Sequence, residues 1–353
     1  MRKSWWHKVT ITDIIVWAIG IAIAVVVVYG SIMTLASGKY TLANWIDLAI
    51  RGLAQGAVYA LIAMGYTLVY GVLKMINFAH SEVFTGGVFT AVFLAQWLAT
   101  IGIVNSNPFL YWILCGILAM IISTGIAILL ERVAYRPLRG APRLVPLITA
   151  IGASFFLQYT YRGFYGSGIQ AYPMPELFQQ SIEFNNFKIY VSQLVVIISG
   201  FLMMLVLFSI VQYTRIGKAM RAVSEDKEVS ALMGIDVDRV IVFTFALGGA
   251  SAGVAGILYV MLFPIVNFFM GFIPGLKAFT AAVLGGIGSV PGAFLGGTLL
   301  GLLESIGPTL FLDGMGIPAP YQLKDAIAFA ILVFILIFRP TGIMGEKLTQ
   351  AKA

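Results

Sequence analysis

Long apolar runs separated by short polar segments follow one another along almost the whole chain. A helix that spans a bilayer needs about 20 mostly apolar residues. Eight runs meet or approach this length: Ile11–Tyr29, Ile46–Leu73, Phe78–Leu98, Pro108–Leu130, Leu144–Arg162, Val191–Val211, Val240–Pro264 and Leu323–Phe338. Because backbone groups in hydrocarbon must hydrogen-bond within their own segment, we predict a helix for each run.

A further apolar run, Leu276–Ser305, is too long for one helix and is interrupted by Gly285-Gly286-Ile287-Gly288-Ser289-Val290-Pro291-Gly292. The break predicts a hairpin of two halves with about 10–14 apolar residues each, which is short for a full crossing. Non-helical backbone at membrane depth is tolerated only where it is buried or lines an aqueous cavity. The candidate pathway residues of the hairpin are therefore Gly285, Gly286, Gly288, Ser289 and Pro291. The alternative is a plain cytoplasmic turn between two short helices.

These runs predict an all-α fold, a polytopic transmembrane bundle of about 8–10 helices with one Gly/Pro-broken hairpin near 276–305. Lys and Arg accumulate in cytoplasmic loops. The loops Glu131–Arg143 and Gln212–Arg239 are rich in these bases, whereas Gly163–Tyr190 has only Lys188. We therefore predict the first two loops inside, the third outside and both termini in the cytoplasm. The basic residues before the first run are Arg2, Lys3 and Lys8.

The first apolar run, Ile11–Tyr29, is longer than the usual 7–15-residue core of a signal peptide. We predict that residues 1–40 form an extra, uncleaved anchor helix, with a cleaved signal peptide as the alternative. The main membrane domain is then 41–345, and 346–353 is a cytoplasmic tail.

Composition supports the membrane assignment, because 60% of the residues are hydrophobic and only 10% are charged, against roughly a quarter charged in soluble domains. The formal charge of +7 comes from bases scattered between apolar runs, so we predict no nucleic-acid partner. The single cysteine, Cys115, excludes an intrachain disulfide and a Cys-rich metal site.

Small residues four apart on a helix let two backbones approach closely in lipid. Four glycine pairs have this spacing: Gly52/Gly56, Gly249/Gly253, Gly292/Gly296 and Gly297/Gly301. We predict that they seal the bundle within one chain; formation of a dimer is the alternative.

Several kinds of chemistry are missing from the sequence. It contains no G-x-x-x-x-G-K-[ST] phosphate loop, no H-E-x-x-H motif and no G-x-S-x-G motif. Carboxylates at the centre of a span would indicate ion coupling, but Glu82, Glu304 and Asp325 fall near the predicted ends of spans. We therefore predict no enzymatic activity, cofactor or metal, and no ion-coupled transport.

The polar loop Arg215–Asp236 predicts two short amphipathic helices. Ser224 is the expected cap of the second helix and Gly234 its stop. Val229, Leu232 and Met233 lie at positions i, i+3 and i+4 and form an apolar stripe. Such a stripe on a polar segment must be buried against another surface. Pattern alone allows packing on this chain's own helix ends or docking of a cytoplasmic partner.

Glu228-Val-Ser-Ala-Leu-Met-Gly234 matches the E-x-x-x-x-x-G core of the loop by which permeases of ATP-binding-cassette importers bind their ATPases, although Val229 and Ser230 replace the usual small residues. With its flanks, this loop resembles the branched-chain amino-acid permease family, H-type subunit. The resemblance implies an ATPase-coupling loop with these residues: Arg215, Gly217, Lys218, Arg221, Glu225, Glu228, Leu232 and Gly234.

A second polar segment, Asn77-Phe-Ala-His80-Ser-Glu82, opens the third run. Asn77 is an expected helix cap, with His80 as a satisfied interfacial histidine; the alternative is that Asn77, His80 and Glu82 line a pathway or gate. The segment resembles the N-F-A-H-G-E of the same family, with Ser81 in place of Gly. Two further stretches resemble it, the hairpin from Lys277 and Phe338-Arg-Pro-Thr-Gly-Ile-Met-Gly345.

The resemblance extends from about Ile46 to Gly345 and implies a permease subunit in the inner membrane of a prokaryote. The partners that it implies are a homologous M-type permease, two cytoplasmic ATPases and an extracytoplasmic solute-binding protein. Branched-chain amino acids are the expected substrate; urea, short amides or other amino acids are alternatives within the family. A passive pore is the alternative from a different class.

Overall fold

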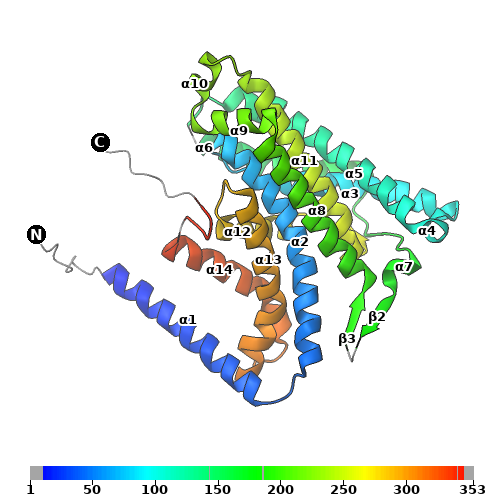
Figure 1. Cartoon of the computed structure of the whole chain (residues 1–353), viewed down its shortest axis with the longest axis vertical. Helices are drawn as coiled ribbons and strands as arrows, with labels where there is room; N and C mark the ends of the chain where they lie inside the picture. Colours follow the sequence, from blue (N-terminus) through cyan, green and yellow to red (C-terminus); the bar gives the residue numbers. More distant parts are fainter. Residues whose placement is uncertain (1–10, 143, 185–186, 340, 346–353) are drawn as a thin grey trace, which may run out of the picture.

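The computed structural model describes residues 11–142, 144–184, 187–339 and 341–345. Within these ranges nine helices are long and apolar enough to cross a membrane, and α12 is a shorter apolar helix. The bundle in Figure 1 consists of α1 (Ile11–Ala36), α2 (Leu42–Leu73), α3 (His80–Thr100), α5 (Pro108–Leu130), α6 (Leu144–Tyr165), α8 (Val191–Tyr213), α11 (Val237–Leu262), α12 (Phe272–Gly285), α13 (Val290–Gly307) and α14 (Lys324–Phe338). The predicted all-α bundle is confirmed.

Short elements lie at the two ends of the bundle. One end carries α9 (Arg215–Glu225), α10 (Lys227–Leu232), the π-helical turn η1 (Glu131–Tyr135) and the 3₁₀ turn η2 (Arg136–Leu138). The connections at the other end contain α4 (Ile103–Ser106), α7 (Glu176–Gln179), η3 (Pro308–Leu312), η4 (Asp313–Met315) and η5 (Pro320–Leu323). Two antiparallel pairs lie on that side, β1 (Gln170–Ala171) with β4 (Ile265–Val266) and β2 (Ser181–Phe184) with β3 (Phe187–Tyr190).

Ion pairs place the connections on two faces. Asp238, which follows the loop of α9 and α10, pairs with both Arg136 and Arg139, so the two basic loops lie on one face. On the opposite face Lys39 pairs with Asp313 at 3.0 Å. The grouping agrees with the alternation of loop charges. Arg2, Lys3, Lys8 and Arg143 lie outside the described residues.

Close glycine contacts hold α2 at the centre of the bundle. A Cβ atom at Gly301 would lie 2.4 Å from the carbonyl oxygen of Gly52, and one at Gly297 would lie 2.4 Å from the backbone of Ala60. The helices α11 and α5 also approach closely at Gly253, where a Cβ would lie 2.6 Å from the carbonyl oxygen of Ala119 in α5. Helix backbones that approach this closely gain packing energy in lipid. The predicted role of the glycines within one chain is confirmed.

The predicted hairpin is present, but its two arms are unequal. α12 has only 14 residues, whereas α13 continues through η3 and η4 as an apolar stretch of 26 residues, Val290–Met315, long enough to cross. The prediction of two short halves is therefore wrong for the second arm. It failed because Gly307-Pro308 looks like a helix end, while the structure continues there as a π-helix that begins with proline.

The second half of the chain also returns into the bundle without a helix. After α11, the segment from Phe263 to Gly271 contains no helix; its one regular element is the two-residue strand β4. At Gly271 a Cβ would lie 2.1 Å from Thr85 Oγ1 and 2.4 Å from the carbonyl oxygen of Ser81. Hence α12 begins beside the first turns of α3 rather than beside its far end at Thr100.

The turn of the hairpin is covered by the segment that follows α14. Gly286 and Gly288 adopt φ angles of 104° and 107°, which favour glycine. The amides of Ile343 and Met344 donate to the carbonyls of Leu284 and Gly285, each at 2.9 Å. The Arg-Pro-Thr-Gly-Ile-Met-Gly segment thus satisfies the last carbonyls of α12.

The extra first helix is longer than predicted and ends at Ala36. Its C-terminal half meets the π-helical extension of α13, where a Cβ at Gly30 would lie 1.9 Å from the carbonyl oxygen of Phe311. Its N-terminal half contacts α14 through Trp17 and Phe338, whose rings are 6.0 Å apart. The predicted tail, 346–353, lies outside the described residues.

Candidate functional site

The loop between α8 and α11 folds into the two helices that were predicted, but with a different cap. Asp226 is the N-cap of α10, and its Oδ1 accepts from the amides of Glu228 and Val229 at 2.8 and 3.0 Å. Ser224 lies inside α9 and donates to the carbonyl of Arg221 at 2.6 Å. The assignment of Ser224 as the cap is therefore wrong. Gly234 follows α10 with a φ of 84°, as expected for a helix stop.

The apolar stripe of α10 does not pack on this chain. Leu232 is 87% exposed, Met233 78% and Val229 54%, although the segment around them is too polar for a lipid-facing helix. Figure 1 shows α10 at the extreme end of the bundle, beyond the ends of the long helices. Packing of these three side chains on the chain's own helix ends is therefore excluded.

The other coupling-loop candidates fall into two groups. Gly217 and Arg221 serve the fold: a Cβ at Gly217 would lie 2.3 Å from the carbonyl of Ile210, and Arg221 Nη1 donates to the carbonyl of Val211 at 2.9 Å. The exposed candidates are Arg215, Lys218, Glu225, Glu228, Leu232 and Gly234.

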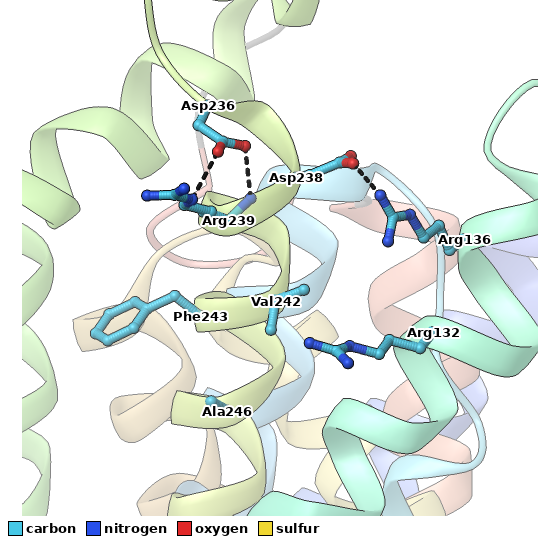
Figure 2. A pocket seen from close by; sticks show the side chains of 8 residues that line it. All are labelled: Arg132, Arg136, Asp236, Asp238, Arg239, Val242, Phe243 and Ala246. Atoms are coloured by element: carbon cyan, nitrogen blue, oxygen red, sulfur yellow. Dashed lines mark hydrogen bonds and ion pairs between the residues drawn. The ribbon is translucent and has the colours of Figure 1, made fainter.

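Beside α10 the same face carries a groove of about 510 Å³ with basic side chains at its mouth. Figure 2 shows the side chains of Arg132 and Arg136 extending from one wall toward α11, which forms the other wall. Partial burial, together with the positive charges of Arg139 and Lys74, lowers the pKa of Lys227 in α10. Three arginines and two aspartates are among the described residues that line the groove, so its net charge is positive and complements acidic groups on a partner.

A chain of polar contacts leads from this face into the bundle. Arg139 bridges Asp238 of α11 and the fully buried Glu131 of η1. One turn further along η1, Tyr135 donates through its hydroxyl to Asn77 Oδ1 at 2.5 Å. Asn77 therefore does not cap α3; the cap residue is Ala79, which makes no side-chain cap. Instead, Asn77 ties the start of α3 to η1.

His80 lies at the start of α3 and is 1% exposed. It fills the space above Gly65, where a Cβ would lie 2.0 Å from His80 Nε2, and its ring meets Tyr66 edge-on at 5.0 Å. Among the described residues nothing hydrogen-bonds to Nε2. His80 is thus deeply buried, and the expectation of a hydrogen-bonded histidine is not met at Nε2 by any described residue.

Glu82 is the most unusual side chain of this cluster, because its carboxylate is 0% exposed. Gln158 donates to Oε1 at 2.8 Å and Ser154 at 3.4 Å. The Ser81 hydroxyl lies 3.2 Å from Oε1 and 3.0 Å from the carbonyl oxygen of Phe78, so its single proton serves one of the two. All these groups reach the same oxygen, and no described residue donates to Oε2. A buried carboxylate with an unpaired oxygen is costly and therefore marks a functional site by default.

A cavity of about 210 Å³ lies directly beside these serines. Four helices or their preceding turns contribute its lining: Tyr66, Phe78, Ser81, Ile151, Ser154, Phe155, Phe272 and Leu276. The hairpin thus reaches the cavity through the start of α12. Gly285, Gly286, Gly288, Ser289 and Pro291 are not part of this lining; they form the turn, in which Ser289 Oγ accepts from the amide of Gly292 at 3.1 Å.

A second buried polar cluster was not predicted as a site. Lys277 of α12 is paired with Glu304 of α13 and, at 2.6 Å, with Asp325 of α14. Lys277 and Glu304 are 3% and 1% exposed. Because α13 continues to Met315, Glu304 lies in the interior of a span. The prediction that no span has a central carboxylate is therefore wrong, but the lysine supplies a fixed countercharge, so the cluster gives no support to ion coupling.

Comparison with known proteins identifies relatives over nearly the whole chain. A sequence model of the family described as branched-chain amino acid transport system / permease component matches residues 48–336. The high-affinity branched-chain amino acid transport system permease protein BraD of Pseudomonas aeruginosa is 42% identical over 307 residues, which cover 86% of this chain and 96% of BraD.

The corresponding permease protein LivH of Escherichia coli is 41% identical over 304 residues, covering 84% of this chain and 94% of LivH. A probable LivH of Methanocaldococcus jannaschii is 28% identical over 320 residues, covering 87% and 96%. The family match begins after α1, at residue 48.

Proposed function

Since this chain belongs to the family of branched-chain amino acid transport permease components, we propose that it forms the translocation pathway of an ATP-binding-cassette importer for leucine, isoleucine and valine. The helices identify it as a multi-pass membrane protein. The importer has its ATPases on separate subunits, and this chain is not itself an enzyme.

The observation that carries the proposal is the exposed apolar stripe of α10. A six-residue helix with Leu232 and Met233 exposed by 87% and 78% is suited to insertion into a hydrophobic groove of another protein. Its electropositive surroundings favour an acidic rim on that partner. An ATPase that holds α10 would act on α11 through the Asp238 pairs and on the start of α3 through Tyr135 and Asn77.

The assembly that we propose has three further kinds of subunit. A homologous M-type permease completes the pathway, two ATPases bind the basic face, and an extracytoplasmic solute-binding protein delivers substrate to the opposite face. The membrane is the cytoplasmic membrane of a prokaryote, with the basic face and both termini in the cytoplasm.

The double substitution Glu228→Lys with Leu232→Asp tests the proposal. It removes an acidic contact and places a charge in the docking stripe, so we expect the ATPases to be lost on co-purification and ATP-driven uptake of labelled leucine to stop. Insertion into the membrane should be unchanged, because neither side chain is buried in this chain.

Ile182→Asp is the matched control, since Ile182 is 51% exposed but lies on β2 at the other face; it should retain the ATPases. Wild-type co-purification with the double variant would refute the docking role. Uptake of urea instead of leucine by the intact complex would refute the substrate.

A further inference from the structure

We propose that Glu82, with Ser81 and Ser154, binds the ammonium group of an aliphatic amino acid, and that the adjoining cavity holds its side chain. The choice of ligand rests on the proposed function; the subsite itself rests on the geometry of α3, α6 and α12.

No described residue supplies a cation to the carboxylate of Glu82. Gln158 and Ser154 donate to Oε1, the Ser81 hydroxyl lies 3.2 Å from it, and Oε2 is buried without a partner among the described residues. Glu304 differs from Glu82, because its carboxylate is paired with Lys277 of the same chain. A carboxylate in low dielectric gains most from a cation that can also donate hydrogen bonds.

The cavity has the size and surface for an aliphatic ammonium compound. Its volume of about 210 Å³ matches a small aliphatic molecule rather than a peptide or a sugar chain. Among the described residues that line it, the polar side chains are those of Tyr66, Ser81 and Ser154. Glu82 lies behind the two serines, in contact with both, and is not itself in the lining. Aromatic rings of Tyr66, Phe78, Phe155 and Phe272 favour cations over anions, and none of the described residues in the lining is a lysine or an arginine.

The surrounding backbone supports a site of passage. Non-helical backbone occurs at membrane depth only where it is buried or lines a cavity, and the non-helical segment before α12 ends at Gly271, against Ser81 and Thr85. On the other wall, Ile151 and Phe155 of α6 are 43% and 48% exposed. The cavity is therefore open at the side of the helix bundle, where these α6 residues are exposed.

A cysteine-protection experiment tests the subsite. Ser154→Cys is introduced into the full chain with Cys115→Ala, and the purified transport complex is treated with N-ethylmaleimide. Leucine and isoamylamine, which is leucine without its carboxylate, should slow the modification. Isocaproate, which is leucine without its amino group, should not. Adding Glu82→Gln should weaken protection by isoamylamine about tenfold or more, since a hydrogen bond to a charged group is lost.

The matched control is Asp47→Asn, which removes a half-buried carboxylate paired with Arg51 in α2 and should leave protection unchanged. Protection is expressed for each variant relative to its own rate without ligand, because loss of the carboxylate charge beside the thiol changes that rate. Elution of the same intact complex from size-exclusion chromatography, with and without Glu82→Gln, verifies that the fold is intact. A second measurement is transport: Glu82→Gln should lose leucine uptake, with partial rescue in Glu82→Asp, whereas Asp47→Asn should keep its uptake.

Equal protection by isocaproate, or protection that survives Glu82→Gln, would refute the ammonium site. The two proposals can fail separately. If the importer proposal is wrong and the subsite is right, the α10 double variant would keep its leucine uptake, while isoamylamine would still protect Ser154→Cys from modification.

Discussion

Single buried charges decide how α12 is held in the bundle. Lys277 lies between Glu304 and Asp325, and its ammonium also lies 3.4 Å from the hydroxyl of Tyr59. Buried ion pairs contribute little net stability, but the loss of one partner leaves an uncompensated charge. The cluster therefore fixes the position of α12 against α13, α14 and α2 more than it raises overall stability.

Lys277→Met should lower the free energy of unfolding by about 3–5 kcal/mol, because Glu304 would remain buried without its cation. Glu304→Gln in the same chain should recover much of this loss. Thermal unfolding of the purified protein in detergent measures both effects. Lys39→Met, which breaks the exposed pair with Asp313, should unfold close to the wild type. A double variant no more stable than Lys277→Met alone would contradict the explanation.

The packing of whole helices depends on the glycine contacts between α2 and α13. A side chain at Gly301 would meet the carbonyl of Gly52 and the backbone of Gly56, each at 2.4 Å, so it has no space unless the helices separate. In contrast, nothing lies within 4 Å of a Cβ at Gly125 of α5. The same residue type thus has opposite tolerances on two helices.

Gly301→Val should destabilise the protein by about 1–3 kcal/mol through overpacking, whereas Gly125→Val should be close to neutral. The midpoint of thermal unfolding in detergent distinguishes the two variants. Equal midpoints would show that α2 and α13 do not rely on this contact.

The apolar runs, the break in the hairpin and the apolar stripe of α10 were predictable because each depends on residues close in sequence. The burial of Glu82 was not, since its partners Ser154 and Gln158 come from α6, 72 and 76 residues further along the chain. Asn77 looked like a cap for the same reason: its partner Tyr135 is 58 residues away. The buried cluster around Lys277 left one signal in the sequence, because a lysine inside an otherwise apolar segment needs a partner for its charge.

For the molecule as a whole, the ion pairs group the loops by face, and the excess of arginine on one face predicts which side is cytoplasmic. In a Cys115→Ala background, Ser181→Cys on β2 should react with a membrane-impermeant thiol reagent added to intact cells. Gly140→Cys, in the basic loop after η2, should react only after the cells are opened. Both positions are exposed. Labelling of Gly140→Cys in intact cells would reverse the proposed orientation.

The pairing of Ile343 and Met344 with the carbonyls of Leu284 and Gly285 has a consequence for the order in which the protein is made. The ribosome completes the hairpin well before it reaches the segment that covers the turn. Until then two carbonyls at the end of α12 lack these donors, so the hairpin cannot reach its final state during its own insertion. Translation beyond α14 is therefore the step that closes the hairpin, and a chain terminated at Phe338 would have all its crossings but an unfinished turn.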